Sequence, residues 1–288
     1  MPTLNLSSEF GRLIVLESLR PSDVKTGQRL LTHIHRWVVE GAALPPAGLK
    51  RVENATELGD AIDVLCRLSL REGRIPILHI EAHGGKPGLQ CADGSYLHWP
   101  DLADLLRPIN GECRNNLLLV LACCDGNYFA LELLKAAVLD RCPVWALVAC
   151  SGPAGPYDID LGFYRFYEEF LASGDGNAAL EALNAAASGS QQFMFIPAEK
   201  MFLDFFRYYL SAHGTRRVRQ ARVEECLSEI IEAGLPGSLQ EHRDNLKFRI
   251  SRPEVVFAEK RDHCLWLDLY PEERARFPSL FAHASERP

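Results

Sequence analysis

The chain has 288 residues, with 31 Lys and Arg against 38 Asp and Glu, so its formal net charge is −7. Hydrophobic residues make up 47% and charged residues 24%, which is typical of soluble globular proteins and excludes disorder, collagen and coiled coil as whole-chain descriptions. The acidic balance also argues against a nucleic-acid partner.

The longest apolar runs, residues 117–124 and 144–150, are far shorter than the roughly 20 residues that cross a bilayer. No secretory signal is visible at the start of the sequence, so we expect a cytoplasmic protein without a membrane partner. Nine cysteines lie in apolar surroundings and none forms a CxxC pair, so we expect buried thiols rather than disulfides. No metal-ligand spacing occurs, and we expect neither a metal nor an organic cofactor.

Apolar runs of strand length alternate with segments of helical period, the pattern of an α/β fold with a mainly parallel sheet. We predict strands at residues 13–16, 75–82, 117–122, 144–149 and 193–196, and a small hairpin at residues 89–98. The predicted helices begin at the Pro21-Ser22-Asp23 segment, at the capping pair Asn54 and Glu57, at Pro100, after Gly126, at Asp160 and at Asp175.

The pattern changes near residue 198, where mainly helical segments begin. We predict helices at residues 201–210 and 218–233, whereas residues 246–288 show no clear period. The predicted domains are therefore residues 1–197 and a helical C-terminal extension, residues 198–288. A basic stretch within the extension is interpreted as a solvated helix face; it contains Arg216, Arg217, Arg219 and Arg222.

Two predicted strands end in residues that can carry chemistry. His83 follows one buried strand and precedes Gly84, and Cys123 follows the next long buried strand. The carboxyl ends of parallel strands meet at one edge of a sheet, so we expect the imidazole and the thiol to lie close together. An imidazole can take the thiol proton, and a helix that starts near Gly126 would favour the thiolate. Glycine beside the histidine leaves room for a substrate carbonyl to reach backbone N–H groups.

A hydrophobic strand ending in His83-Gly84, followed by one ending in Ala122-Cys123, resembles the caspase-type cysteine peptidases. The hairpin between the two strands and the segment of residues 122–126 are most similar to the bacterial branch called CHAT. The resemblance covers about two thirds of the chain, roughly residues 13–187. It implies a three-layer αβα sandwich, with His83 as general base, Cys123 as nucleophile, and Gly84 and Cys123 as donors to the oxyanion.

The sequence departs from the caspase pattern at two points. Leu121 stands where caspases have the glutamine of Gln-Ala-Cys. The doubled cysteine also leaves the register open, because Cys123 has the preceding alanine whereas Cys124 has the glycine two residues later. Side chains alternate across a strand, so only one of the two can face the histidine. We favour Cys123 and keep Cys124 as the alternative nucleophile.

Substrate recognition is less clearly encoded. Within this group of peptidases the residue before the cleaved bond is either acidic or basic, and Asp158 and Asp160 are candidates for an acidic pocket that binds a basic residue. Asp160 could equally cap the helix that follows it. Glu81 shares a strand face with His79 and His83, and could orient an imidazole or be a rim charge.

The resemblance implies a cytosolic cysteine endopeptidase that cleaves selected proteins through a thioester, in the manner of bacterial enzymes of defence or regulated cell death. Its partner would be a protein or peptide substrate. The C-terminal region, from Ala198 onward, is not covered by the resemblance, and we expect it to regulate the site or to dock a protein partner. The alternative is a catalytically inactive caspase-like fold that serves as a protein-binding or assembly module. A nucleotide-binding α/β protein is disfavoured because no phosphate-binding glycine motif follows any strand.

Overall fold

The computed structural model describes residues 10–39, 45–136, 140–187, 192–213 and 216–277. The contacts divide the chain into two compact units. The first contains the described residues up to Ala136 and those of Arg141–Ala198, and the second contains Asp140 and the described residues from Glu199 onward. The division lies one residue beyond the boundary that the sequence pattern indicates.

The first unit alternates strands and helices. Its strands are β1 (Phe10–Ser18), β2 (Ala47–Arg51), β3 (Ile75–Gly85), β4 (Gly88–Gln90), β5 (Tyr96–His98), β6 (Leu118–Ala122), β7 (Ala146–Cys150) and β8 (Phe193–Pro197). Its helices are α1 (Thr26–Val39), α2 (Ala55–Arg71), α3 (Trp99–Glu112), α4 (Asn127–Ala136), α5 (Pro156–Ser173) and α6 (Gly176–Ala186). The predicted strands and hairpin are all present, and β2 is an additional short strand.

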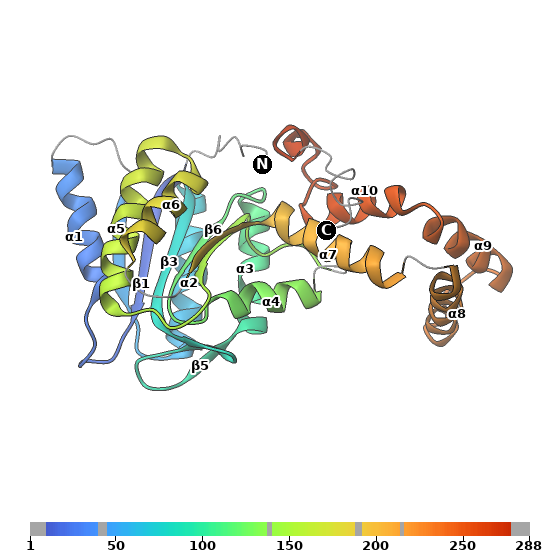
Figure 1. Ribbon diagram of the computed structural model, residues 1–288, viewed down its shortest axis with the longest axis horizontal. Helices are drawn as coiled ribbons and strands as arrows, with labels where there is room; N and C mark the ends of the chain where they lie inside the picture. Colours follow the sequence, from blue (N-terminus) through green and yellow to red (C-terminus); the bar gives the residue numbers. More distant parts are fainter. Residues whose placement is uncertain (1–9, 40–44, 137–139, 188–191, 214–215, 278–288) are drawn as a thin grey trace. The chain divides into compact units, whose positions relative to one another are not determined.

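The strands form one sheet of order β2-β1-β3-β6-β7-β8, with the β4–β5 hairpin attached to β3. The neighbours from β2 to β7 run parallel, whereas β8 runs antiparallel to β7. Helices lie on both sides of this sheet, α1 and α5 on one side and α2 and α3 on the other (Figure 1). The fold is therefore an α/β fold with a mixed, mostly parallel sheet, an arrangement consistent with a three-layer sandwich.

Burial on both faces explains the composition of the central strands. All five residues of β6 are buried, as are all five of β7. A strand covered by helices on both sides cannot alternate apolar with polar residues, so it has a continuous apolar run. The same cover leaves the strand ends as the places where polar side chains meet solvent.

Helix starts follow the predicted caps in some places and not in others. The Asn54 side chain accepts a hydrogen bond from the Glu57 N–H at 2.9 Å, so the predicted start of α2 is confirmed. The predicted start at Asp160 is wrong, because α5 begins four residues earlier at Pro156, whose fixed φ suits the first turn of a helix. Asp160 is therefore inside the helix and does not cap it.

The second unit is helical. It contains α7 (Ala198–His213), α8 (Arg216–Glu232), α9 (Leu239–Ile250), α10 (Pro253–Cys264) and a 3₁₀ helix, η1 (Pro271–Arg276). Phe257 of α10 packs against Phe202 and Phe206 of α7, with ring centroids 5.2 and 4.9 Å apart. Ser238 and Glu241 form a capping box at the start of α9. Residues 246–277, which have no clear sequence period, are thus largely helical.

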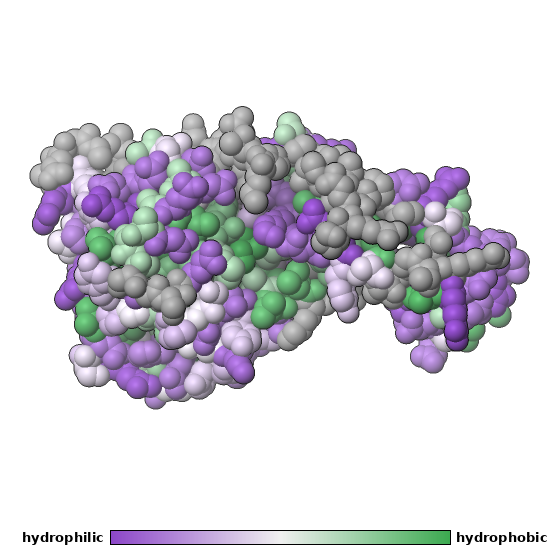
Figure 2. Space-filling model, viewed as in Figure 1, coloured by the Kyte–Doolittle hydropathy of each residue, from purple (hydrophilic) through white to green (hydrophobic). Residues whose placement is uncertain are grey.

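Charged and polar side chains cover most of the surface in view, with apolar side chains between them (Figure 2). Large exposed apolar residues are scattered over both units; examples are Val24, Tyr96, Tyr157, Tyr208, Ile231 and Leu235. None of the helices in the described ranges has the length and apolar character that spanning a lipid bilayer requires.

Candidate active site

His83 lies near the carboxyl end of β3, where this strand pairs with β4 of the hairpin. Its Nε2 atom is 2.9 Å from Oδ2 of Asp23, in the segment that connects β1 to α1. The side chain of His83 is 41% exposed and that of Asp23 is 25% exposed. The imidazole is therefore accessible to a substrate and fixed by a carboxylate.

A tight turn fixes Asp23 in place. Its Oδ2 atom accepts a hydrogen bond from the Arg20 N–H at 2.8 Å, and its own N–H donates to the Arg20 carbonyl at 2.9 Å. Burial raises the pKa of the Asp23 carboxyl, but the hydrogen bonds from His83 and Arg20 and their charges outweigh it, so this pKa lies below its ordinary value of 3.8. Asp23 is ionised at neutral pH and favours the His83 tautomer protonated at Nε2, which leaves Nδ1 as the basic nitrogen.

Cys123, the predicted nucleophile, is inside the protein and only 1% exposed. Its sulfur lies against two glycines: an added Cβ would come within 2.8 Å of Sγ at Gly84 and within 3.4 Å at Gly126. Burial, and after it the neighbouring Cys124, raise the pKa of the Cys123 thiol well above its ordinary value of 9.0. A buried sulfur that keeps its proton is a poor nucleophile, so the structure argues against the preference for Cys123.

Cys124, the alternative nucleophile, is partly exposed. The pairing of β3 with β6 sets Glu81 opposite Ala122, so His83 and Cys124 each follow that pair by two residues. β6 ends at Ala122, and continuing its alternation of side chains by two residues would place Cys124 on the face of His83 and Cys123 on the opposite face. The register, taken with the burial of Cys123, favours Cys124 as the nucleophile, and the choice between the two cysteines stays a prediction.

The backbone of Ala154 holds the Cys124 sulfur. Its N–H donates to Sγ at 3.3 Å, and the thiol donates to its carbonyl oxygen at 3.7 Å. Both hydrogen bonds that the structure gives this sulfur are with Ala154, in the loop between β7 and α5. One backbone donor and one backbone acceptor of the same residue therefore hold this sulfur in place.

The chain turns sharply after Cys124. Asp125 has a φ of 53°, in the left-handed region that few residues other than glycine adopt, and α4 begins two residues later at Asn127. The first N–H groups of a helix have no partner within it and give its N-terminus a partial positive charge. The turn thus directs this end of α4 toward the carboxyl edge of the sheet, beside Cys124.

The two aspartates predicted to line an acidic pocket are in different surroundings. Oδ2 of Asp160 forms an ion pair with Arg29 of α1 at 2.9 Å, so this carboxylate already has a cationic partner. Asp158 is buried in the first turn of α5, and an added Cβ on Gly155 would lie 3.4 Å from its Oδ2. Neither is a solvent-exposed carboxylate, and a role for Asp158 in substrate binding stays a prediction.

Glu81 orients a histidine other than His83. Its Oε1 atom is 3.0 Å from Nε2 of His79, and both side chains are buried. The interpretation of Glu81 as a rim charge is therefore wrong. The residue that does orient His83 is Asp23, which the sequence indicated only as part of a helix start. Ala154 contacts Cys124 through backbone atoms, so no pattern of side chains could predict this contact.

The described contacts thus bring His83, Asp23 and Cys124 to one edge of the sheet, and they place Cys123 in the interior. A scan against models of known protein families finds no match to this chain, and a search of curated proteins finds none either. The chemistry inferred for this edge depends on the residues themselves.

Proposed function

We propose that this protein is a cysteine peptidase of the caspase-like type, with Cys124 as nucleophile, His83 as general base and Asp23 as the group that orients the base. The observation that carries the proposal is the 2.9 Å contact between Nε2 of His83 and Oδ2 of Asp23, at the carboxyl edge of the sheet that the partly exposed Cys124 also borders. Nucleophile, base and orienting carboxylate are the recurring parts of such hydrolases.

In the proposed reaction, Nδ1 of His83 takes the proton of the Cys124 thiol, and the sulfur attacks the carbonyl carbon of a peptide bond. The resulting tetrahedral intermediate collapses to a thioester when the imidazolium gives its proton to the leaving amine. Water then attacks the thioester with His83 again as base, which releases the acid and restores the thiol. Asp23 stays ionised throughout and stabilises the imidazolium.

The sulfur has to exchange its partner during this cycle. In this structure the Cys124 sulfur is hydrogen-bonded to the backbone of Ala154. The reaction requires the sulfur to approach the imidazole of His83. Catalytic hydrogen bonds are commonly long or misaligned in the absence of substrate. We assign the Ala154 N–H the role of stabilising the thiolate before it attacks.

Backbone N–H groups are the proposed donors to the oxyanion. With Cys124 as nucleophile, the donor pair becomes Gly84 and Cys124, because these two segments are in backbone contact. The positive end of α4 supports the same charge. A peptide or protein is the proposed substrate class, in line with the resemblance to cysteine peptidases.

A positional library of fluorogenic peptides tests this proposal, with the wild type compared to Cys124→Ala, Cys123→Ala and His83→Ala. We expect cleavage by the wild type and by Cys123→Ala, which removes the neighbouring sulfur as a matched control, and none by the other two. Cleavage that survives Cys124→Ala, or no cleavage of any peptide by the wild type, contradicts the proposal. In the second case, a non-catalytic binding module becomes the better account.

A further inference from the structure

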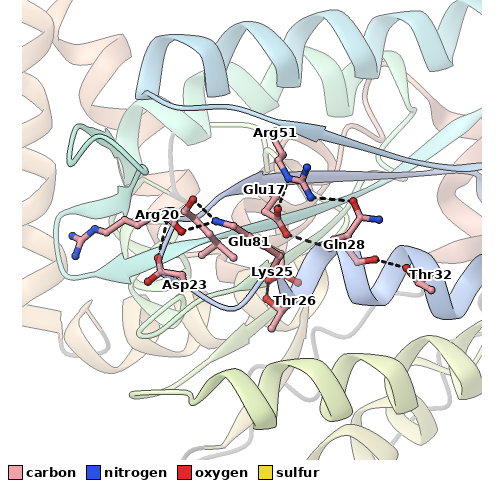
Figure 3. A network of polar contacts seen from close by, with 10 residues as sticks. Glu17, Arg20, Asp23, Lys25, Thr26, Gln28, Thr32, Arg51 and Glu81 are labelled. Atoms are coloured by element: carbon pink, nitrogen blue, oxygen red, sulfur yellow. Dashed lines mark hydrogen bonds and ion pairs between the residues drawn. The ribbon is translucent and has the colours of Figure 1, made fainter.

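The first turn of α1 rests on two buried carboxylates. Glu17 of β1 and Glu81 of β3 are paired in register, and each is only 1% exposed. The Thr26 hydroxyl donates a short hydrogen bond to Glu81, and the Gln28 N–H donates to Glu17 at 3.2 Å (Figure 3). Because carboxylates are favourable at a helix N-terminus, this pair fixes where α1 begins.

Further groups complete the environment of both carboxylates. Arg51 donates from Nε to Glu17 at 2.9 Å (Figure 3), and His79 lies 3.0 Å from Glu81. The other ring nitrogen of His79 is 3.0 Å from the hydroxyl of Tyr167 in α5. A buried polar network is rigid when its members are satisfied, so α1 is tied to the sheet by defined bonds rather than by apolar packing alone.

The same anchor determines the position of Asp23. The connection between β1 and α1 spans residues 19–25, and Lys25 closes its base by donating to the carbonyls of Leu19 and Arg20 at 2.7 and 2.5 Å. Near His83, the connection and the first residue of α1 form three hydrogen bonds with the sheet. Those bonds are Thr26 to Glu81, Asp23 to His83, and Arg20 to Gln90, the residue of β4 that pairs with His83.

We propose that Thr26 and Glu81 are positioning residues, which hold the Asp23 carboxylate against Nε2 of His83 and thereby keep the imidazole in the tautomer that the reaction needs. The inference rests on the proposed role of His83 as base. Glu81 and His83 lie two residues apart on β3. The hydrogen bond between Thr26 and Glu81 therefore fixes the loop that carries Asp23 to the strand that carries His83. Neither residue has to touch the substrate.

The tautomer of His83 can be read from the nitrogen-15 shifts of its imidazole at a pH where the ring is neutral, with the signal assigned by its loss in His83→Gln. The test variant is Thr26→Val, and the matched control is Thr32→Val, the same change on the same helix at an exposed site whose hydroxyl donates to the Gln28 carbonyl. Asp23→Asn gives the signal of an imidazole without its carboxylate.

We expect the Nε2-protonated form to dominate in the wild type and in Thr32→Val, and the signal of Thr26→Val to shift toward that of Asp23→Asn. Glu81→Gln, checked for retained fold by circular dichroism, should shift the signal in the same direction. An unchanged tautomer in Thr26→Val, with only a lower Tm, would show a purely structural role and overturn the inference. This readout needs no catalytic turnover, so it can fail while peptide cleavage succeeds, or the reverse.

Discussion

The backbone of Gly84 lies directly against that of Cys124: an added Cβ on Gly84 would be 2.0 Å from the Cys124 carbonyl oxygen. Such a separation is far below any van der Waals contact. The segment that carries the imidazole and the segment that carries the partly exposed thiol are therefore in contact through their main chains, and only glycine permits it at this position.

This contact predicts the effect of Gly84→Ala. The new methyl group must displace the Cys124 backbone, and overpacking of this kind costs about 1–3 kcal/mol of stability. We expect a lower Tm together with loss of peptide cleavage. Gly85→Ala is the matched control, because its added Cβ would meet only Pro87 at an ordinary 3.7 Å. Full activity in Gly84→Ala would contradict the close approach of the two segments.

Asp23→Asn should slow peptide cleavage on the order of 100-fold or more, because the amide cannot stabilise an imidazolium and allows the wrong tautomer. The measurement is kcat/KM on the best peptide of the library. Asp160→Asn serves as control, since its carboxylate pairs with Arg29 and not with His83. Equal losses in the two variants would remove the special role of Asp23.

Glu199 predicts a pH-dependent stability in the helical unit. Burial raises the pKa of this carboxyl to about 7 from its ordinary 4.5, although a backbone hydrogen bond and the charge of Arg276 oppose the change. Between pH 4.5 and about pH 7, the Glu199 carboxyl is ionised in the unfolded chain and protonated in the folded chain. The stability that is fully present below pH 4.5 is therefore lost as the pH rises to about 7.

Replacing Glu199 by glutamine removes this loss. We expect Glu199→Gln to raise the free energy of unfolding at pH 8 by about 1–3 kcal/mol and to change it little at pH 4, as measured by urea denaturation. The exposed Glu254 of α10, changed to glutamine, is the control and should show no such difference. A variant less stable than the wild type at pH 8 would contradict the raised pKa of Glu199.

Much of the sheet could be predicted from sequence because its signals are local. Residues 117–122 form a continuous apolar run that has the length of a strand, and Asp93-Gly94 marks a hairpin turn. The edge strand β2 has no such signal, since only part of Ala47–Arg51 is sheltered from solvent. Helices α9 and α10 lack a clear apolar stripe, so their period is not visible in the sequence.

The site shows a different limit. The alternation of side chains along a strand predicts that Cys123 and Cys124 lie on opposite faces. Which of them faces His83 depends on the register of β6 with β3, and this register pairs residues 41 apart in sequence, such as Glu81 and Ala122. Asp23 is 60 residues from His83 in sequence. A hydrogen bond over that distance follows from the packing of a loop on a sheet edge, and no local pattern encodes it.

The most direct test of the account compares the two adjacent thiols in one molecule. Folded wild-type protein is treated briefly with iodoacetamide at pH 7.5, and the peptide that contains both cysteines is sequenced by tandem mass spectrometry. We predict alkylation of Cys124, slower in His83→Ala, with Cys123 modified only after unfolding. Preferential modification of Cys123 in the folded protein would contradict the assignment of the nucleophile.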